Sequence, residues 1–185
     1  MAEVEKHHAD ATTFSKTITK SELYETALVS ASSLFDSQTF WPSNLANAAS
    51  LCWYAFEALE MRVNWSGFYV SSSCLKTKPD GNEEMLLLGP FMGRVACQTI
   101  KIGRGVCGTA ASTKITQVVP NVLEFPGHIA CDGDTMSEVV VPLVDSEGVV
   151  RGVLDIDCLI VNGFDEVDVE FLEKLAKLVT DACEW

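Results

Sequence analysis

The chain has 185 residues, of which 48% are hydrophobic and 21% are charged, and this ordinary globular composition excludes a disordered protein. A chain of this length buries about 70% of its unfolded surface, enough to form one domain without disulfide or metal cross-links. Thirteen basic and 26 acidic residues give a net charge of −13, which repels phosphate backbones and anionic lipids. We therefore expect neither nucleic acid nor membrane as a partner.

The first 18 residues are polar and show no periodicity, so we predict a flexible N-terminal arm over 1–18 and a single domain over 19–185. No apolar run approaches the roughly 20 residues that span a bilayer. The N-terminal segment has neither the apolar stretch of a secretory signal nor the arginine-rich character of a transit peptide. These features predict a cytoplasmic location.

Two helices are predicted after the arm. Thr19 and Glu22 form a capping-box pattern, and apolar residues then follow at helical spacing as far as Asp36. A second helical pattern begins at Trp41-Pro42-Ser43, with Ser43 as the expected N-cap, and continues to Leu59.

From Arg62 onward the pattern changes to that of strands. Apolar and β-branched residues predict strands in NWSGFYVSSS (64–73), EEMLLLG (83–89), VACQTIKI (95–102) and TQVVPNV (116–122), and a hairpin in SEVVVPLV-DSEG-VVRGVLDID (137–157). A short helical piece covers 108–114, and Asp165 begins a last helix. This order predicts an α+β fold: one domain with a central antiparallel sheet flanked by N- and C-terminal helices.

A glycine-rich turn, IGRGVCGTA (102–110), contains G-x-G-x-x-G with Cys107 inside it. A dinucleotide-binding turn needs a parallel βαβ unit with a helix of several turns, but the helical piece here is short and Pro120 interrupts the next strand. We interpret the glycines as permitting positive φ and close backbone approach around Cys107. Because this cysteine would lie near a helix N-terminus, unpaired N–H groups there would favour its thiolate.

The chain has seven cysteines, an odd number, and the expected compartment is reducing, so a static disulfide framework is not expected. The alternatives left are catalytic or redox-active thiols and small buried hydrophobic residues. His128 and Cys131 have a spacing that zinc ligands can adopt, but no C-x-x-C pair completes the set. We therefore predict no metal and no cofactor.

The last predicted strand carries carboxylates on one face. Alternation places Val150, Gly152, Leu154 and Ile156 under the helices, and Arg151, Val153, Asp155 and Asp157 on the opposite face. Two carboxylates at i and i+2 repel each other unless a cation or a shared proton relieves the repulsion. The face is therefore either a site for an ammonium group or proton donor, or simply a solvated surface.

Six segments together resemble the free methionine-(R)-sulfoxide reductases, enzymes built on a GAF-type domain. The segments are NWSGFYV (64–70), LGPFMGRVACQTI (88–100), IGRGVCGTA (102–110), FPGHIACD (125–132), SEVVVPL (137–143) and GVLDIDC (152–158). The resemblance implies a GAF-like catalytic domain over 19–185. It covers the sheet region from about residue 64 to 158, with flanking helices that are consistent with it.

The resemblance also implies roles for individual residues. Cys131 matches the cysteine most often assigned as nucleophile, and Cys97 and Cys107 match its disulfide partners, without settling which of the two resolves. Substrate-pocket residues are matched by the carboxylates Glu138, Asp155 and Asp157 and by the aromatic residues Trp65 and Tyr69. The remaining cysteines, Cys52, Cys74, Cys158 and Cys183, match no catalytic position and are interpreted as structural.

The activity implied by the resemblance is reduction of free L-methionine-(R)-sulfoxide through a sulfenic acid and an intramolecular disulfide, which a thioredoxin-type reductant recycles. A homodimer is possible. Two other functions compete with this one: a GAF module that senses a cyclic nucleotide or similar small molecule, and a protein whose cysteines switch a partner surface. The acidic face disfavours a cyclic phosphate, because like charges repel.

Overall fold

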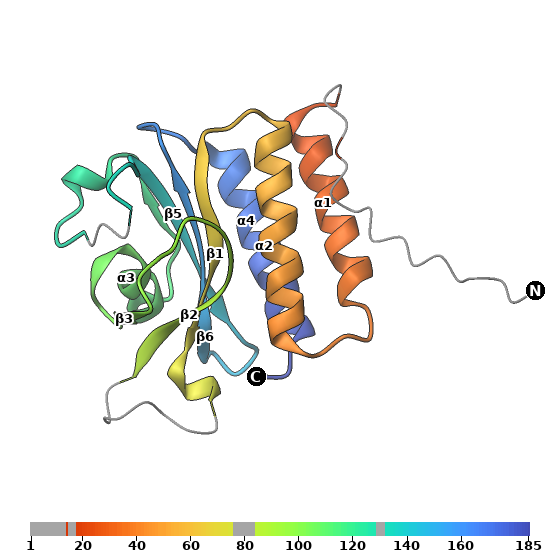
Figure 1. Cartoon of the computed structure of the whole chain (residues 1–185). Coiled ribbons are helices and arrows are strands. Elements are labelled where there is room, and N and C mark those ends of the chain that lie inside the picture. Colours follow the sequence, from red (N-terminus) through yellow and green to blue (C-terminus); the bar gives the residue numbers. More distant parts are fainter. Residues whose placement is uncertain (1–13, 15–17, 76–83, 129–131) are drawn as a thin grey trace, which may run out of the picture.

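The computed structural model describes residue 14 and residues 18–75, 84–128 and 132–185. One six-stranded sheet forms its centre, with α1, α2 and α4 on one face and α3 on the other (Figure 1). The helices are α1 (Lys20–Phe35), α2 (Trp41–Ala58), α3 (Gly105–Thr113) and α4 (Glu166–Ala182), with 3-10 turns at η1 (Ser72–Cys74) and η2 (Val122–Glu124). The strands are β1 (Val63–Ser71), β2 (Met85–Gly93), β3 (Thr99–Lys101), β4 (Gln117–Val119), β5 (Ser137–Val144) and β6 (Val150–Cys158).

The strand order is β3-β2-β1-β6-β5-β4, and every neighbouring pair is antiparallel. The predicted α+β class and central antiparallel sheet are therefore confirmed. The order places the two ends of the strand region, β1 and β6, side by side at the centre of the sheet. The glycine turn before α3 lies outside any parallel βαβ unit, which excludes the dinucleotide-binding alternative.

The helix starts follow the sequence signals in two cases and differ in one. Thr19 caps α1 through the predicted capping box with Glu22, and Asp165 caps α4 with its side chain. The expected N-cap of α2 was wrong: the cap is Phe40, and Ser43 lies inside the first turn. Pro42 accounts for the earlier start, because its fixed φ and missing N–H suit the first helical turn.

The strand predictions hold except in two segments, and in one of these, 116–122, only Gln117–Val119 forms a strand while Val122 begins η2. The hairpin of β5 and β6 forms as expected, whereas only Thr99–Lys101 of the predicted 95–102 strand is extended and paired. The preceding residues form a loop, in which the Gln98 carbonyl still accepts a hydrogen bond from the Leu88 N–H of β2 at 3.0 Å. Cys97 consequently lies on a loop and not on a strand.

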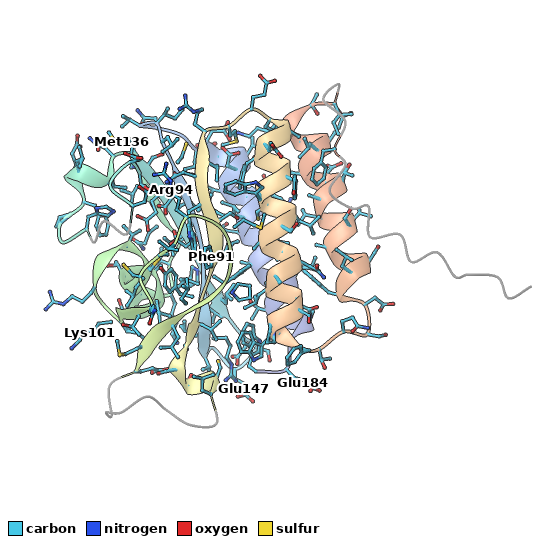
Figure 2. The ribbon with its side chains drawn as sticks, viewed as in Figure 1. Phe91, Arg94, Lys101, Met136, Glu147 and Glu184 are labelled. Atoms are coloured by element: carbon cyan, nitrogen blue, oxygen red, sulfur yellow. The ribbon has the colours of Figure 1, made fainter. Side chains whose placement is uncertain are left out.

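Side chains pack on both faces of the sheet (Figure 2). The larger core lies under the helices, where Phe56 of α2 and Phe171 of α4 meet Leu154 and Ile156 of β6. The smaller core lies between the sheet and α3. No helix among the described residues is long and apolar enough to cross a membrane.

Two residues of the predicted N-terminal arm are described. Phe14 and Ile18 are partly buried and pack against the larger core. Residues 1–13 and 15–17 lie outside the described residues, so the flexible arm and its boundary at residue 18 stay predictions.

Candidate active site

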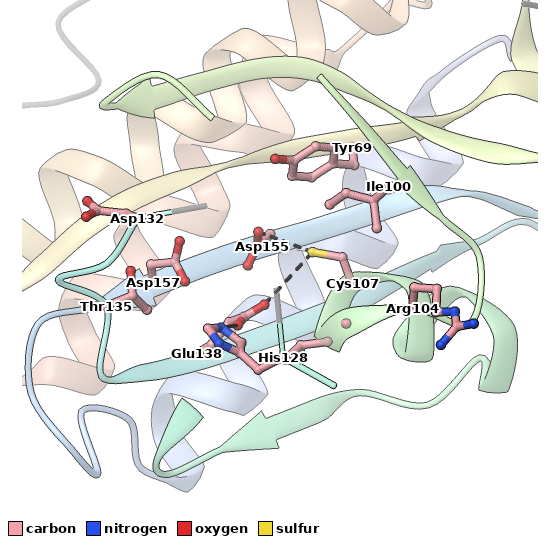
Figure 3. Close-up of a pocket in the computed structure, with 12 residues that line it drawn as sticks. Tyr69, Ile100, Arg104, Cys107, His128, Asp132, Thr135, Glu138, Asp155 and Asp157 are labelled. Carbon is pink, nitrogen blue, oxygen red and sulfur yellow. Dashed lines mark hydrogen bonds and ion pairs between the residues drawn. The ribbon is translucent and has the colours of Figure 1, made fainter. Parts of the chain in front are cut away.

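The face of the sheet opposite α1, α2 and α4 carries a pocket that combines carboxylates with a thiol (Figure 3). Its walls come from β1, β3, β5, β6, the first turn of α3 and the loop that follows η2. The lining residues are Tyr69, Ile100, Arg104, Gly105, Val106, Cys107, His128, Asp132, Thr135, Glu138, Asp155 and Asp157. The pocket thus brings together segments that lie far apart in the sequence.

The three predicted carboxylates meet in this pocket. Glu138 on β5 is directly opposite Asp157 on β6, and strand alternation puts Asp155 on the same face. Glu138 and Asp155 are each 6% exposed. Burial, followed by the charge of a neighbouring carboxylate, raises the pKa of all three well above the ordinary range. At least one of these groups therefore holds a proton at a pH where an exposed carboxyl has lost it.

Asp155 has an incomplete set of hydrogen bonds. Its Oδ2 lies 3.2 Å from Cys107 Sγ, whereas its buried Oδ1 accepts no hydrogen bond from any described residue. An unpaired buried carboxylate oxygen is costly, so the position suits a ligand that donates a hydrogen bond.

Cys107 lies in the first turn of α3, which begins at Gly105 and so earlier than the predicted 108. The expected position near a helix N-terminus is confirmed, but the expected thiolate character of Cys107 was wrong. Its side chain is buried, 3.2 Å from Asp155 Oδ2 and 4.0 Å from Glu138 Oε1. Burial and these two carboxylates raise the pKa of the thiol well above its usual value. Their effect outweighs that of the helix N-terminus, so Cys107 is a protonated donor to Asp155.

The glycine-rich turn positions Cys107 as we interpreted it. Gly103 and Gly105 have φ of +81° and +63°, which other residues rarely adopt. A Cβ on Gly108 would lie 2.4 Å from the Lys101 carbonyl oxygen, and the Gly103 N–H donates to the Gly108 carbonyl at 2.8 Å. The turn therefore closes tightly against the start of α3.

The two predicted aromatic residues occupy successive layers. Tyr69 lines the pocket directly. Trp65 is buried behind it, with ring centroids 5.8 Å apart, and also stacks on Phe91 at 5.2 Å. Trp65 is not among the residues that line the pocket, so it supports Tyr69 from the second layer.

Four polar or charged residues that line the pocket were not among the site residues predicted from the sequence. His128 was interpreted as an ordinary loop residue, yet its Nε2 lies 3.6 Å from Glu138 Oε2, and burial lowers its pKa. Thr135 and Asp132 are both held by Asn64 Nδ2, at 3.0 Å and 3.1 Å. Arg104, the fourth, is the N-cap residue of α3. The glycine- and proline-rich loop around His128 was the available signal, but loop positions alone do not show what they contact.

The cysteines fall into distinct groups. Cys97 is bonded in a disulfide, whereas the free thiols among the described residues are Cys52, Cys74, Cys107, Cys158 and Cys183. Cys52 and Cys158 are fully buried, and burial raises the pKa of Cys52 to about 12. The predicted nucleophile, Cys131, lies outside the described residues. Of the two proposed disulfide partners, Cys97 and Cys107, only Cys97 is bonded in the described structure.

The arrangement can bind a cation and transfer a proton. Buried carboxyls with raised pKa values supply a proton at neutral pH, and their remaining charge attracts an ammonium group. The first turn of α3, at Gly105 and Val106, offers N–H groups to an anion. A zwitterionic small molecule matches this combination.

Known proteins share this fold and sequence. The family model of the GAF domain matches residues 44–184. Two proteins named free methionine-R-sulfoxide reductase are similar in sequence to this chain. The protein of Saccharomyces cerevisiae is 53% identical, and the match covers 96% of this chain and 94% of the relative. The protein of Escherichia coli is 37% identical, and the match covers 84% of this chain and 86% of the relative. The structure of the Neisseria meningitidis free methionine-R-sulfoxide reductase in complex with its substrate has a TM-score of 0.76 and 39% identity, covering 91% of this chain and 92% of its own. The chain belongs to the free methionine-R-sulfoxide reductase family of GAF domain proteins.

Proposed function

We propose that this protein reduces free L-methionine-(R)-sulfoxide to methionine in the cytoplasm. The observation that carries the proposal is the group of the buried Glu138 and Asp155 and the partly buried Asp157 beside the N-terminus of α3. This group matches a small zwitterion with an oxygen to be protonated. The relatives named above support it, because they carry this activity in their names and one was solved with its substrate.

Substrate binding follows from the charges of the pocket. The ammonium group donates to Asp155 Oδ1, which has no other donor among the described residues. The substrate carboxylate accepts from N–H groups in the first turn of α3. Tyr69 and Ile100 contact the apolar side chain of the substrate. Preference for the R epimer is proposed from the family alone.

The reaction pairs a thiolate with an acid. The Cys131 thiolate attacks the sulfoxide sulfur, forming a sulfur–sulfur bond, while Glu138 protonates the sulfoxide oxygen. The sulfur–sulfur bond formed by this attack then breaks as the protonated oxygen transfers to the Cys131 sulfur, so methionine leaves and Cys131 becomes a sulfenic acid. A second thiol attacks this sulfur and releases water, forming a disulfide. A thioredoxin-type dithiol then supplies two electrons and two protons by exchange.

Cys97 is the proposed resolving thiol. It is a disulfide cysteine, whereas Cys107 is free, buried and held as a protonated thiol by two carboxylates. A group of that kind is a poor nucleophile. Cys107 instead acts as a hydrogen-bond donor that positions Asp155.

The experiment that tests the function is methionine release from the free R sulfoxide, with the free S epimer and a peptide-bound sulfoxide as matched substrates and thioredoxin or dithiothreitol as reductant. We expect turnover of the free R epimer only. Fully reduced protein without turnover would contradict the proposal and favour a binding module.

Cysteine variants test the assigned roles. Cys131→Ser abolishes turnover. Cys97→Ser completes one turnover without a reductant and is recycled by dithiothreitol, which reduces the sulfenic acid directly, but not by thioredoxin. Cys74→Ser, which changes a partly buried thiol outside the pocket, is the matched control and keeps full activity.

A further inference from the structure

Cys107, Glu138 and Asp155 form a set of ligand atoms from three different elements. One atom of each side chain lies within 4.8 Å of the other two. Figure 3 shows the thiol of α3 pointing between the carboxylates of β5 and β6, at 3.2 Å from Asp155 Oδ2 and 4.0 Å from Glu138 Oε1. All three side chains are buried. These three ligands differ from the pair His128 and Cys131, whose spacing in the sequence is one that zinc ligands can adopt.

The separations match those of a tetrahedral metal centre. With zinc–sulfur bonds of about 2.3 Å and zinc–oxygen bonds of about 2.0–2.2 Å, ligand sulfur and oxygen atoms lie roughly 3.5 Å apart. The two observed sulfur–oxygen distances bracket that value. Thiolate and carboxylate ligands together suit a borderline cation such as zinc and disfavour magnesium, which prefers oxygen ligands alone.

A second observation indicates a ligand at this point. Asp155 is 6% exposed, lines the pocket, and has an Oδ1 without a hydrogen-bond donor among the described residues. His128 Nε2 lies 3.6 Å from Glu138 Oε2, which places a nitrogen ligand beside the cluster. A divalent cation would compensate the buried negative charge, and it would use the unpaired Oδ1 as well as Oδ2 if Asp155 binds it through both oxygens.

We infer that Cys107, Glu138 and Asp155 bind a zinc-like divalent cation, with His128 or water in the fourth position. Binding converts the Cys107 thiol into a thiolate, so it releases a proton. The site uses the carboxylates assigned above to substrate. If the proposed function holds, metal and methionine sulfoxide therefore exclude each other, but metal binding itself does not depend on that function.

The test is titration of the purified chain with zinc in competition with a chromophoric chelator, and with cobalt followed by its thiolate charge-transfer absorption. Both the disulfide form and a phosphine-reduced form are used, because Cys107 is free while Cys97 is bonded. We expect one metal per chain in both forms. Calorimetry in two buffers that differ in ionisation enthalpy measures how many protons are released on metal binding, because the buffer takes up these protons and adds its own heat.

Variants assign the ligands. Cys107→Ser is expected to weaken zinc binding at least about tenfold and to remove the cobalt charge-transfer band, because the sulfur ligand is lost. Cys74→Ser is the matched control and leaves both unchanged. Asp155→Asn, a near-isosteric change, serves as a second variant if melting shows that Cys107→Ser is unfolded. Undiminished binding in a folded ligand variant, or no binding to the folded wild type, would overturn the inference.

Discussion

Burial has opposite consequences on the two faces of β6. Leu154 and Ile156 are fully buried against the helices, whereas Asp155 and Asp157 face the pocket. Burial of the apolar pair stabilises the fold by about 2 kcal/mol for each side chain. Burial of the carboxyls disfavours their charged form and raises their pKa. Neighbouring residues on one strand thus contribute to stability on one face and to chemistry on the other.

Burial distinguishes the carboxylate face of β6 from an ordinary solvated strand face and makes it a binding site. A solvated strand face would leave the pKa of an aspartate near its ordinary value, but Asp155 is covered by α3 and the loop after η2. Charge that is buried without a cation lowers stability at neutral pH. Substitutions on one face at a time therefore separate the contribution to activity from the contribution to stability.

The largest expected effect comes from the pocket face. Asp155→Asn should lower methionine release about 100-fold or more, because it removes the charged acceptor that holds the ammonium group beside the proton donor Glu138. The free energy of unfolding should not fall, since an amide carries no charge to bury. Steady-state kinetics and urea denaturation measure the two quantities. A loss of stability that parallels the loss of activity would contradict the division between the faces.

The adjacent residue on the covered face should behave in the opposite way. Leu154→Ala leaves a cavity under the helices and should lower the free energy of unfolding by about 2–5 kcal/mol. Because this side chain points away from the pocket, kcat of the folded fraction should remain that of the wild type. Urea denaturation measures the loss of stability, and steady-state kinetics below the melting temperature measures kcat. A reduced kcat in fully folded protein would show that the two faces are coupled.

The pH dependence of stability should come from the pocket face. The folded-state pKa values of Glu138, Asp155 and Asp157 are raised, so the native chain binds more protons than the unfolded chain above the unfolded pKa of about 4. Their contribution is greatest below that pH and is lost as the pH rises through the folded values. Asp155→Asn should therefore gain stability relative to wild type as the pH rises. A constant difference between the two denaturation curves would contradict this sign.

The smallest expected effect lies on the covered side, far from the pocket. Thr19→Ala removes the capping box of α1 and should cost about 1 kcal/mol of stability without changing kcat. Thr26→Ala on the same helix is the matched control, because its hydroxyl bonds only to the exposed Glu22 carbonyl. Equal destabilisation by both would show that the cap makes no special contribution.

Much of the fold and part of the site were predictable from local pattern. Period-two alternation separated Leu154 from Asp155, and capping signals located the starts of α1 and α4. At Ser43 a competing local signal, Pro42, begins the helix earlier. Local pattern also failed in residues 95–102 and 116–122, because strand pairing depends on neighbours elsewhere in the chain. The roles of Cys131 and Cys97, the N-terminal arm and a homodimer stay predictions that came from the resemblance or from composition.

The sequence by itself determined which residues alternate, which cap and which turn, since these depend on near neighbours along the chain. Only the tertiary structure decided the chemical state of Cys107. Its place in the first turn of α3 favours a thiolate, but Glu138 and Asp155, 31 and 48 positions away, bring two carboxyls against the same buried sulfur. Electrostatic interactions across a buried pocket depend on distance in space, so they outweigh a helix terminus that local pattern could identify.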